Sequence, residues 1–195
     1  MLAGAGILMP NTGAPVLALG EHHSLMMKQD GSVWATGDNA FGQLGDGSTL
    51  RCFEFIRTID GVAKAVSVGK DHSMILKQDG SVWIAGQNMY GQLGDGWTLD
   101  KSVFVKVFSA GAHAISAGRY HSAILKRDGS VWAEGANTFG ELGDGSERDR
   151  DRFAKVAQIF DGEWSVSLQM LCIRNAINSL GSSWCVCVCV CVVCV

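Results

Sequence analysis

The sequence lacks several features that mark common classes of function. The 195 residues carry a formal net charge of -3 and a pI near 5.9, so there is no basic excess of the kind that nonspecific nucleic-acid binding needs. The apolar run LAGAGILM at 2–9 has no cationic flank and is too short to span a bilayer. We therefore expect no direct nucleic-acid partner and no membrane insertion.

Motifs of bond-making enzymes are also missing. The sequence contains no P-loop, no GxSxG string and no HExxH string. Cys52 is the only cysteine before residue 167, so the cysteines there do not decide the compartment, and a cytoplasmic or nuclear location is favoured. We predict that the chain is not an enzyme and has no catalytic, cofactor-binding or metal-binding residues.

What the sequence does contain is a strict repeat of 49 residues. Residues 23–47, 72–96 and 121–145 share the same residue at 15 of 25 aligned columns. The repeat brings a histidine, a serine and an aspartate together in HSMILKQDGSVW at 72–83, which resembles a hydrolytic triad. Because a triad is built once per active site, its triplication indicates a structural frame. The frame residues are His23, His72, His121, Asp30, Asp79, Asp128, Gly31, Gly80, Gly129, Trp34, Trp83, Trp132, Asn39, Asn88, Asn137, Gly45, Gly94 and Gly143.

The local signals within one repeat are those of strands and turns. HSMILK at 72–77 and SVWIAG at 81–86 flank an Asp-Gly turn, which is a strong hairpin signal. Further strands are predicted at AVSVG, 65–69, and at FVKV, 104–107, with counterparts in the other repeats. Four short strands per 49 residues predict an all-β fold of four-stranded β-propeller blades.

This architecture predicts structural roles for the recurrent side chains. We expect the tryptophans to pack between neighbouring blades and the histidines to hydrogen-bond to backbone or to a neighbouring loop. Metal ligation by the histidines is disfavoured, because equivalent positions on successive blades do not converge on one ion. The aspartates of LGDG suit Asx-type turns, and the lysines before the turn, Lys28, Lys77 and Lys126, are expected to be solvated.

Over residues 14–166 the chain resembles the regulator-of-chromosome-condensation (RCC) repeat family. The strings GDNAFGQLG, GQNMYGQLG and GANTFGELG carry the resemblance. It implies a propeller, normally of seven blades, that serves as a platform for protein partners. It favours a noncatalytic protein–protein interaction module, a fragment of a larger propeller. The alternatives are a guanine-nucleotide exchange factor or regulator for a small GTPase and a repeat module of a ubiquitin ligase. Candidate interaction loops carry Phe41, Tyr90, Phe139, Gln43, Gln92 and Glu141.

The repeat register fails after residue 166. A fourth copy would need a glycine at 167 and a histidine at 170, where the chain has Ser167 and Met170. We therefore divide the chain into a flexible N-terminal segment (1–13), three repeats with the start of a fourth (14–166) and a non-repeat tail (167–195). About three blades would form an incomplete, open ring, which we expect to self-associate through its open blade edges, to pair with another repeat chain or to aggregate.

The tail ends in the low-complexity tract CVCVCVCVVCV at 185–195. Three interpretations are open. Alternate cysteines could bind a soft metal, although most of the usual C-x-x-C pairs are missing. The tract could form a strand with thiols on one face and an aggregation hazard. Alternating TGT and GTG codons also encode Cys-Val, which favours an origin in noncoding or frame-shifted sequence.

Overall fold

The computed structural model describes residues 16–159 of the chain. The predicted N-terminal segment, the start of a fourth repeat and the Cys/Val tail lie outside these residues. The described part holds the strands β1 (Val16–Leu19), β2 (His23–Met27), β3 (Val33–Gly37), β4 (Cys52–Ile59), β5 (Ala63–Val68), β6 (His72–Lys77), β7 (Val82–Gly86), β8 (Lys101–Phe108), β9 (Ala112–Ala117), β10 (His121–Lys126), β11 (Ser130–Gly135) and β12 (Arg150–Gln158).

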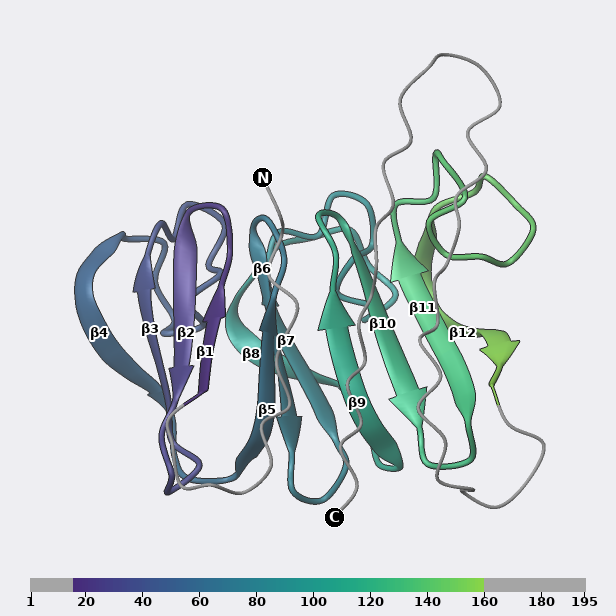
Figure 1. The fold of residues 1–195 in the computed structure, drawn as a ribbon. Coiled ribbons are helices and arrows are strands. Elements are labelled where there is room, and N and C mark those ends of the chain that lie inside the picture. The colour runs from purple at the N-terminus through teal and green to yellow at the C-terminus, as the bar shows by residue number, and fades with distance from the viewer. Residues whose placement is uncertain (1–15, 160–195) are drawn as a thin grey trace, which may run out of the picture.

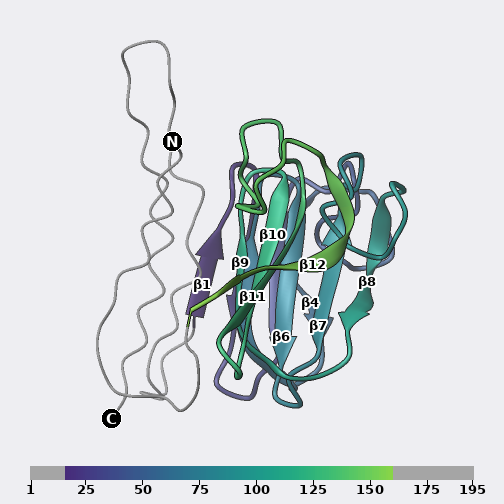
Figure 2. The ribbon, with the colours of Figure 1, turned by 90° about the vertical axis from the view of Figure 1, so that its right-hand side faces the viewer.

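These strands form three four-stranded antiparallel sheets, which confirms the all-β prediction of propeller-like blades. The strand orders are β1-β2-β3-β4, β5-β6-β7-β8 and β9-β10-β11-β12, here called blades 1, 2 and 3. Figure 1 shows the blades side by side in chain order, and Figure 2 shows the same stack from the end formed by blade 3. One rim of the stack is formed by the connections between the first and second strands and between the third and fourth strands of each blade. The other rim, the turn rim, is formed by the turns between the second and third strands.

The outer strand of each blade is longer than the sequence predicted. In blade 2 the predicted strand 104–107 is the middle of β8, which runs from Lys101 to Phe108. The register between β7 and β8 shifts twice, so that Val82 pairs with Phe108 and Gly86 with Lys101. Bulges of this kind bend a strand. They let the outer strand curve along the blade, which residue alternation alone does not reveal.

The apolar core lies between the blades. Leu25, Val33 and Leu44 of blade 1 pack against a group in blade 2 that includes Val66 and Val68. Between blades 2 and 3 the equivalent contact joins side chains such as Met74, Ile84 and Leu93 to Ala117 and Ile124. Trp83 packs against the first core and Trp132 against the second. Full burial of an aliphatic side chain contributes roughly 1.5–3 kcal/mol, so the two junctions hold the stack together.

Between residues 16 and 159 there is no helix with the length and apolar character needed to cross a bilayer.

Candidate protein-interaction surface

A hydrogen-bond relay joins each blade to the next. The His23 Nε2 lies 2.9 Å from the Ser73 Oγ, and the Ser73 hydroxyl donates to the Gln43 carbonyl oxygen at 2.7 Å. Because that hydroxyl has one proton, the Nε2–H of His23 is the donor to Ser73. The relay recurs 49 residues on, where His72 Nε2 lies 3.1 Å from Ser122 Oγ and Ser122 donates to the Gln92 carbonyl oxygen at 2.8 Å.

Burial keeps these imidazoles neutral. Desolvation lowers the pKa of His23 from 6.5 to about 4 and the pKa of His72 to about 3. The Nδ1 atoms of both rings are buried without a hydrogen-bond partner among the described residues. An arrangement in which the ring donates to serine and serine donates to a carbonyl leaves no activated nucleophile. The repeated histidine and serine of the HSMILKQDGSVW motif therefore link one blade to the next.

The Asp-Gly turns form a second recurrent unit, on the turn rim. The Asp79 carboxylate accepts hydrogen bonds from the backbone N–H and the hydroxyl of Ser81, and the Ser81 Oγ accepts the indole N–H of Trp83 at 3.0 Å. The two serine bonds lower the pKa of Asp79. The expected solvation of the preceding lysine is incomplete, since the Lys77 ammonium lies 3.6 Å from the Trp83 ring centroid. The same bonds occur in the other two repeats.

The frame asparagines shape the long connection between the third and fourth strand of each blade. The Asn88 side-chain amide donates to Asp95 Oδ1 and to the Trp97 and Leu99 carbonyl oxygens, while its Oδ1 accepts the Leu93 N–H at 2.9 Å. Asn39 and Asn137 form equivalent bonds in their own loops. One buried side chain therefore folds each loop into a fixed shape.

The candidate loop residues fall into two groups. The Gln43 and Gln92 side chains are buried, and each accepts the backbone N–H two residues earlier, from Phe41 and from Tyr90, at 2.9 Å. Glu141 is half-buried and accepts the Phe139 N–H at 2.8 Å. Phe41 and Tyr90 are half-buried, and the Tyr90 ring lies 5.1 Å from that of Tyr120. Phe139 differs from them, because its side chain is 79% exposed.

Exposed apolar side chains gather in these same connections, which lie along the upper rim in Figure 1 and which we call the loop rim. Trp97 is 64% exposed and Leu99 is 65% exposed. The others in these connections are Leu50, Met89 and Phe139. Surface aromatic and aliphatic side chains grouped on one rim are typical of protein-binding surfaces.

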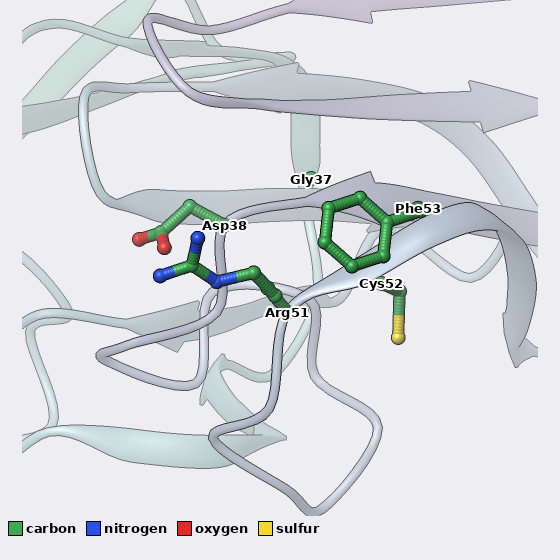
Figure 3. Close-up of a pocket in the computed structure, with 5 residues that line it drawn as sticks. All are labelled: Gly37, Asp38, Arg51, Cys52 and Phe53. Carbon is green, nitrogen blue, oxygen red and sulfur yellow. The ribbon is translucent and has the colours of Figure 1, made fainter.

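A shallow pocket of about 170 Å³ lies where β3 ends and β4 begins. It is lined by Gly37, Asp38, Arg51, Cys52 and Phe53. Figure 3 shows the Arg51 guanidinium extending toward the Asp38 carboxylate, while the Cys52 thiol points away from both. Small-molecule sites usually enclose roughly 300–1,000 Å³, so this pocket is smaller than a usual small-molecule site.

Sequence reasoning missed a buried carboxyl group, Glu134. Its column holds Thr36 in blade 1 and Ala85 in blade 2, so it looked like a variable strand position. In the structure Glu134 is fully buried, and neither of its carboxyl oxygens has a hydrogen-bond partner in the described chain. Burial, reinforced by Asp95 and Asp151, raises its pKa well above the ordinary value. The residues from 16 to 159 contain no cluster of three or more His, Cys, Asp or Glu side chains able to hold a metal ion.

The three repeating sheets, their inter-blade joints and their Asn-shaped loops define a protein built from propeller blades. Family comparison assigns these blades more closely: the Regulator of chromosome condensation (RCC1) repeat matches residues 17–43, 63–92 and 112–141, and a second RCC1 repeat description matches 79–125. The chain belongs to the RCC1 repeat family. Comparison with curated proteins gave no match.

Several solved structures share the fold. Prp20p from Saccharomyces cerevisiae superimposes with a TM-score of 0.66 and 22% identity over 73% of this chain and 38% of its own. Human WBSCR16 gives 0.62 and 22% over 72% of this chain and 38% of its own. Yeast RCC1 (Prp20) bound to Kap60 gives 0.63 and 23% over 75% and 38%. The chain thus spans about two fifths of the length of these structures.

Proposed function

We propose that this chain is a noncatalytic protein–protein interaction module, part of a larger propeller surface, which contacts its partners through the loop rim. The observation that carries the proposal is the grouping of Trp97, Leu99 and Phe139 as exposed side chains on loops that the Asn network holds rigid. Rigid loops lose little conformational entropy on binding, which favours association. The opposite rim is formed by the Asp-Gly turns, whose side chains bond within the turn.

Site-specific photo-cross-linking in cells tests which rim binds. Trp97 is replaced by p-benzoylphenylalanine, and Gln78, an exposed residue in the turn of the same blade, is the matched control position. We expect discrete protein adducts from position 97 and none from position 78. Equal adducts from both positions, or no adduct from position 97, would contradict the proposal.

A second candidate function is regulation of a small GTPase. It is favoured by the fold shared with Prp20p, whose structure is described with its binding to Gsp1p and histones. Purified chain is added to Gsp1p loaded with fluorescent GDP, and nucleotide release is followed in time. Unchanged release together with binding to Gsp1p supports a noncatalytic module. Acceleration that increases with chain concentration supports exchange activity instead.

Self-association is part of the proposed function as well. At the blade 1 end of the stack the described residues leave apolar side chains uncovered, including Leu17 and Leu19 of β1. Contiguous apolar surface of this kind marks an interaction site. Among the described residues, the first and the last sheet each have one face without a neighbouring blade, in addition to the strand edges that the sequence suggested.

A further inference from the structure

We call the contact between two neighbouring described blades a closed junction. At each closed junction the start of the outer strand of one blade lies against the LGDG loop of the blade before it. The Gly47 N–H of blade 1 donates to the Ser102 carbonyl oxygen of β8 at 2.8 Å, and Asp46 pairs with Val103. The Gly96 N–H of blade 2 donates to the Asp151 carbonyl oxygen of β12 at 2.9 Å. These loops are filled: a Cβ built at Gly42 would lie 2.4 Å from the Ser102 Cα.

The third LGDG loop has the same backbone shape, and no described residue fills it. Gly140, Gly143 and Gly145 have positive φ angles, as their counterparts do, yet within the described residues no atom lies within 4 Å of a Cβ built on any of them. His121 likewise has no serine within the described chain to match the one that His72 bonds. We call this half-junction the trailing face, and define it by His121, Ala123, Val131 and the loop at 139–145.

Blade 1 carries the other half of a junction on its opposite side. Leu17 is 52% exposed and Leu19 is 57% exposed, whereas their counterparts Val66 and Val68 in blade 2 are 2% and 0% exposed. Phe55 is 38% exposed, whereas its counterpart Phe104 is 8% exposed. Ser24 stands at the position of Ser73 and Ser122, and no described histidine bonds it. We call this the leading face and define it by Leu17, Leu19, Ser24, Phe53 and Phe55.

We propose that the leading face of one chain docks on the trailing face of a second copy, and that two copies close into a ring of six blades. This inference rests on the self-association part of the proposed function. The contacts between the two copies follow from the 49-residue repeat, because equivalent residues should make equivalent contacts. The Gly145 N–H donates to the Phe53 carbonyl oxygen of the second copy, as Gly47 does to Ser102. The Phe55 ring covers Gly143, as Phe104 covers Gly45.

The His–Ser relay completes the contact. In this docking His121 Nε2 donates to the Ser24 hydroxyl of the second copy, and that hydroxyl donates to the Glu141 carbonyl oxygen. These are the roles that His72, Ser122 and Gln92 play at the closed junction. Each half-junction thus offers the groups that the other lacks, at positions that the same 49-residue frame sets.

Two observations favour a second copy over the residues that follow blade 3 in the chain. The position 49 residues after Ser122 is Leu171, which has no hydroxyl to bond His121. The leading face, by contrast, supplies that serine in register, together with the Phe55 ring. Two chains would make the same contact twice, and heterologous contacts of this kind give a ring when the rotation closes. Six blades lie within the four to eight at which propellers close.

Native mass spectrometry of the full chain tests the ring. We expect a species of twice the 20.8 kDa chain mass. Phe55→Asp damages the leading face and Ala123→Glu damages the trailing face, so each variant alone should have the mass of one chain. An equimolar mixture should regain the two-chain mass, because each partner keeps one intact face. Val62→Asp is the matched control, since Val62 is an exposed apolar residue in the connection between β4 and β5, on neither face, and it should keep the two-chain mass.

A wild-type chain that stays at one chain mass, or that forms open polymers, would overturn the ring. Failure of the two damaged variants to form a pair on mixing would overturn the docking of leading on trailing face. Both results are distinguishable from failure of the proposed function, because the cross-linking position at Trp97 lies on the loop rim of blade 2, away from both faces.

Discussion

The two closed junctions share their hydrogen bonds but differ in what fills them. Between blades 1 and 2 the Phe104 ring lies over Gly45, so that a Cβ at this glycine would be 2.2 Å from the ring. Between blades 2 and 3 the Glu134 carboxyl group lies over Gly94, the equivalent glycine. The relay through Ser73 is matched by the relay through Ser122. The bonded frame therefore repeats, while the filling of each junction varies.

This difference shows how a repeat protein can tolerate a costly residue. A buried carboxyl group without hydrogen bonds destabilises the folded chain, yet the joints around Glu134 are intact. Stability in such stacks is close to a sum over repeats and their interfaces. The loss of stability caused by Glu134 at one junction can then be offset by the hydrogen bonds of the repeat frame in the neighbouring blades.

Acid should break both junctions alike, and we expect this to be the largest effect. Burial lowers the pKa of His23 to about 4 and that of His72 to about 3, so the unfolded chain binds protons below pH 6.5 that the folded chain excludes. The stability that these two neutral rings preserve is full above pH 6.5 and falls as the pH drops toward 3, by on the order of 3 kcal/mol for each ring at pH 4.

Urea unfolding between pH 7 and pH 4 measures this loss. His72→Gln should lessen the pH dependence, whereas His22→Gln, at an exposed site, should change it far less. Equal pH profiles for wild type and His72→Gln would exclude the buried His72 imidazole as a cause.

Removing the filling of the first junction should have the next largest effect. Phe104 is 8% exposed and packs in the core of blades 1 and 2, so Phe104→Ala should cost about 3–5 kcal/mol of unfolding free energy. Leu99→Ala, at a 65% exposed site, serves as the control in the same urea titration. Similar losses for the two variants would show that the Phe104 ring does not support the junction.

Breaking one relay should cost the same at either junction. Ser73→Ala leaves the Gln43 carbonyl and His23 without their partner, and Ser122→Ala does so for Gln92 and His72. Each should lose about 1–3 kcal/mol. Ser109→Ala, at an exposed serine, should change little. A loss at only one of the two junctions, by calorimetry, would contradict a common frame.

Replacing Glu134, which fills the second junction, should raise the free energy of unfolding, whereas the preceding substitutions lower it. Glu134→Met removes the unpaired carboxyl group at similar volume, so at pH 7 it should stabilise the chain by about 1–3 kcal/mol. Burial raises the pKa of Glu134 above its ordinary 4.5, so the folded chain keeps a proton that the unfolded chain releases. Wild-type stability from this group therefore falls as the pH rises above 4.5.

The same titration provides a shape-matched control for the carboxyl group. Glu134→Gln should remove the decline above pH 4.5 while keeping the side-chain shape. A Glu134→Met variant that is less stable than wild type at pH 7 would show that the carboxyl group has a partner in solution.

The smallest effect should come from the lysines over the tryptophans. The Lys77 ammonium lies 3.6 Å from the Trp83 centroid, whereas Lys126 lies 5.2 Å from the Trp132 centroid. Lys77→Ala should lose about 0.5–1 kcal/mol, and Lys126→Ala should lose less. Thermal melts at matched pH measure both, and a larger loss at Lys126 would contradict the cation–π assignment.

The sequence predicted the blades because their signals are local. A turn such as Asp79–Gly80 followed by a tryptophan, repeated every 49 residues, identifies the strands whatever surrounds them. The joints were not predictable in the same way, because His23 bonds Ser73, which is 50 residues distant, and that pairing depends on how one blade packs on the next. Gln43 and Gln92 looked like surface residues for the same reason. Glu134 occupies a variable column, and nothing local shows that it is buried.

The central claim is that the trailing face is an unfilled copy of the two closed junctions, and amide hydrogen exchange at Gly145 tests it most directly. Gly47 and Gly96 donate across their junctions at 2.8 and 2.9 Å and should exchange slowly at every chain concentration. The Gly145 N–H should exchange fast in dilute solution and become as protected as Gly96 as the concentration rises. Fast exchange at Gly145 at all concentrations, or protection that ignores concentration, would contradict docking by a second copy.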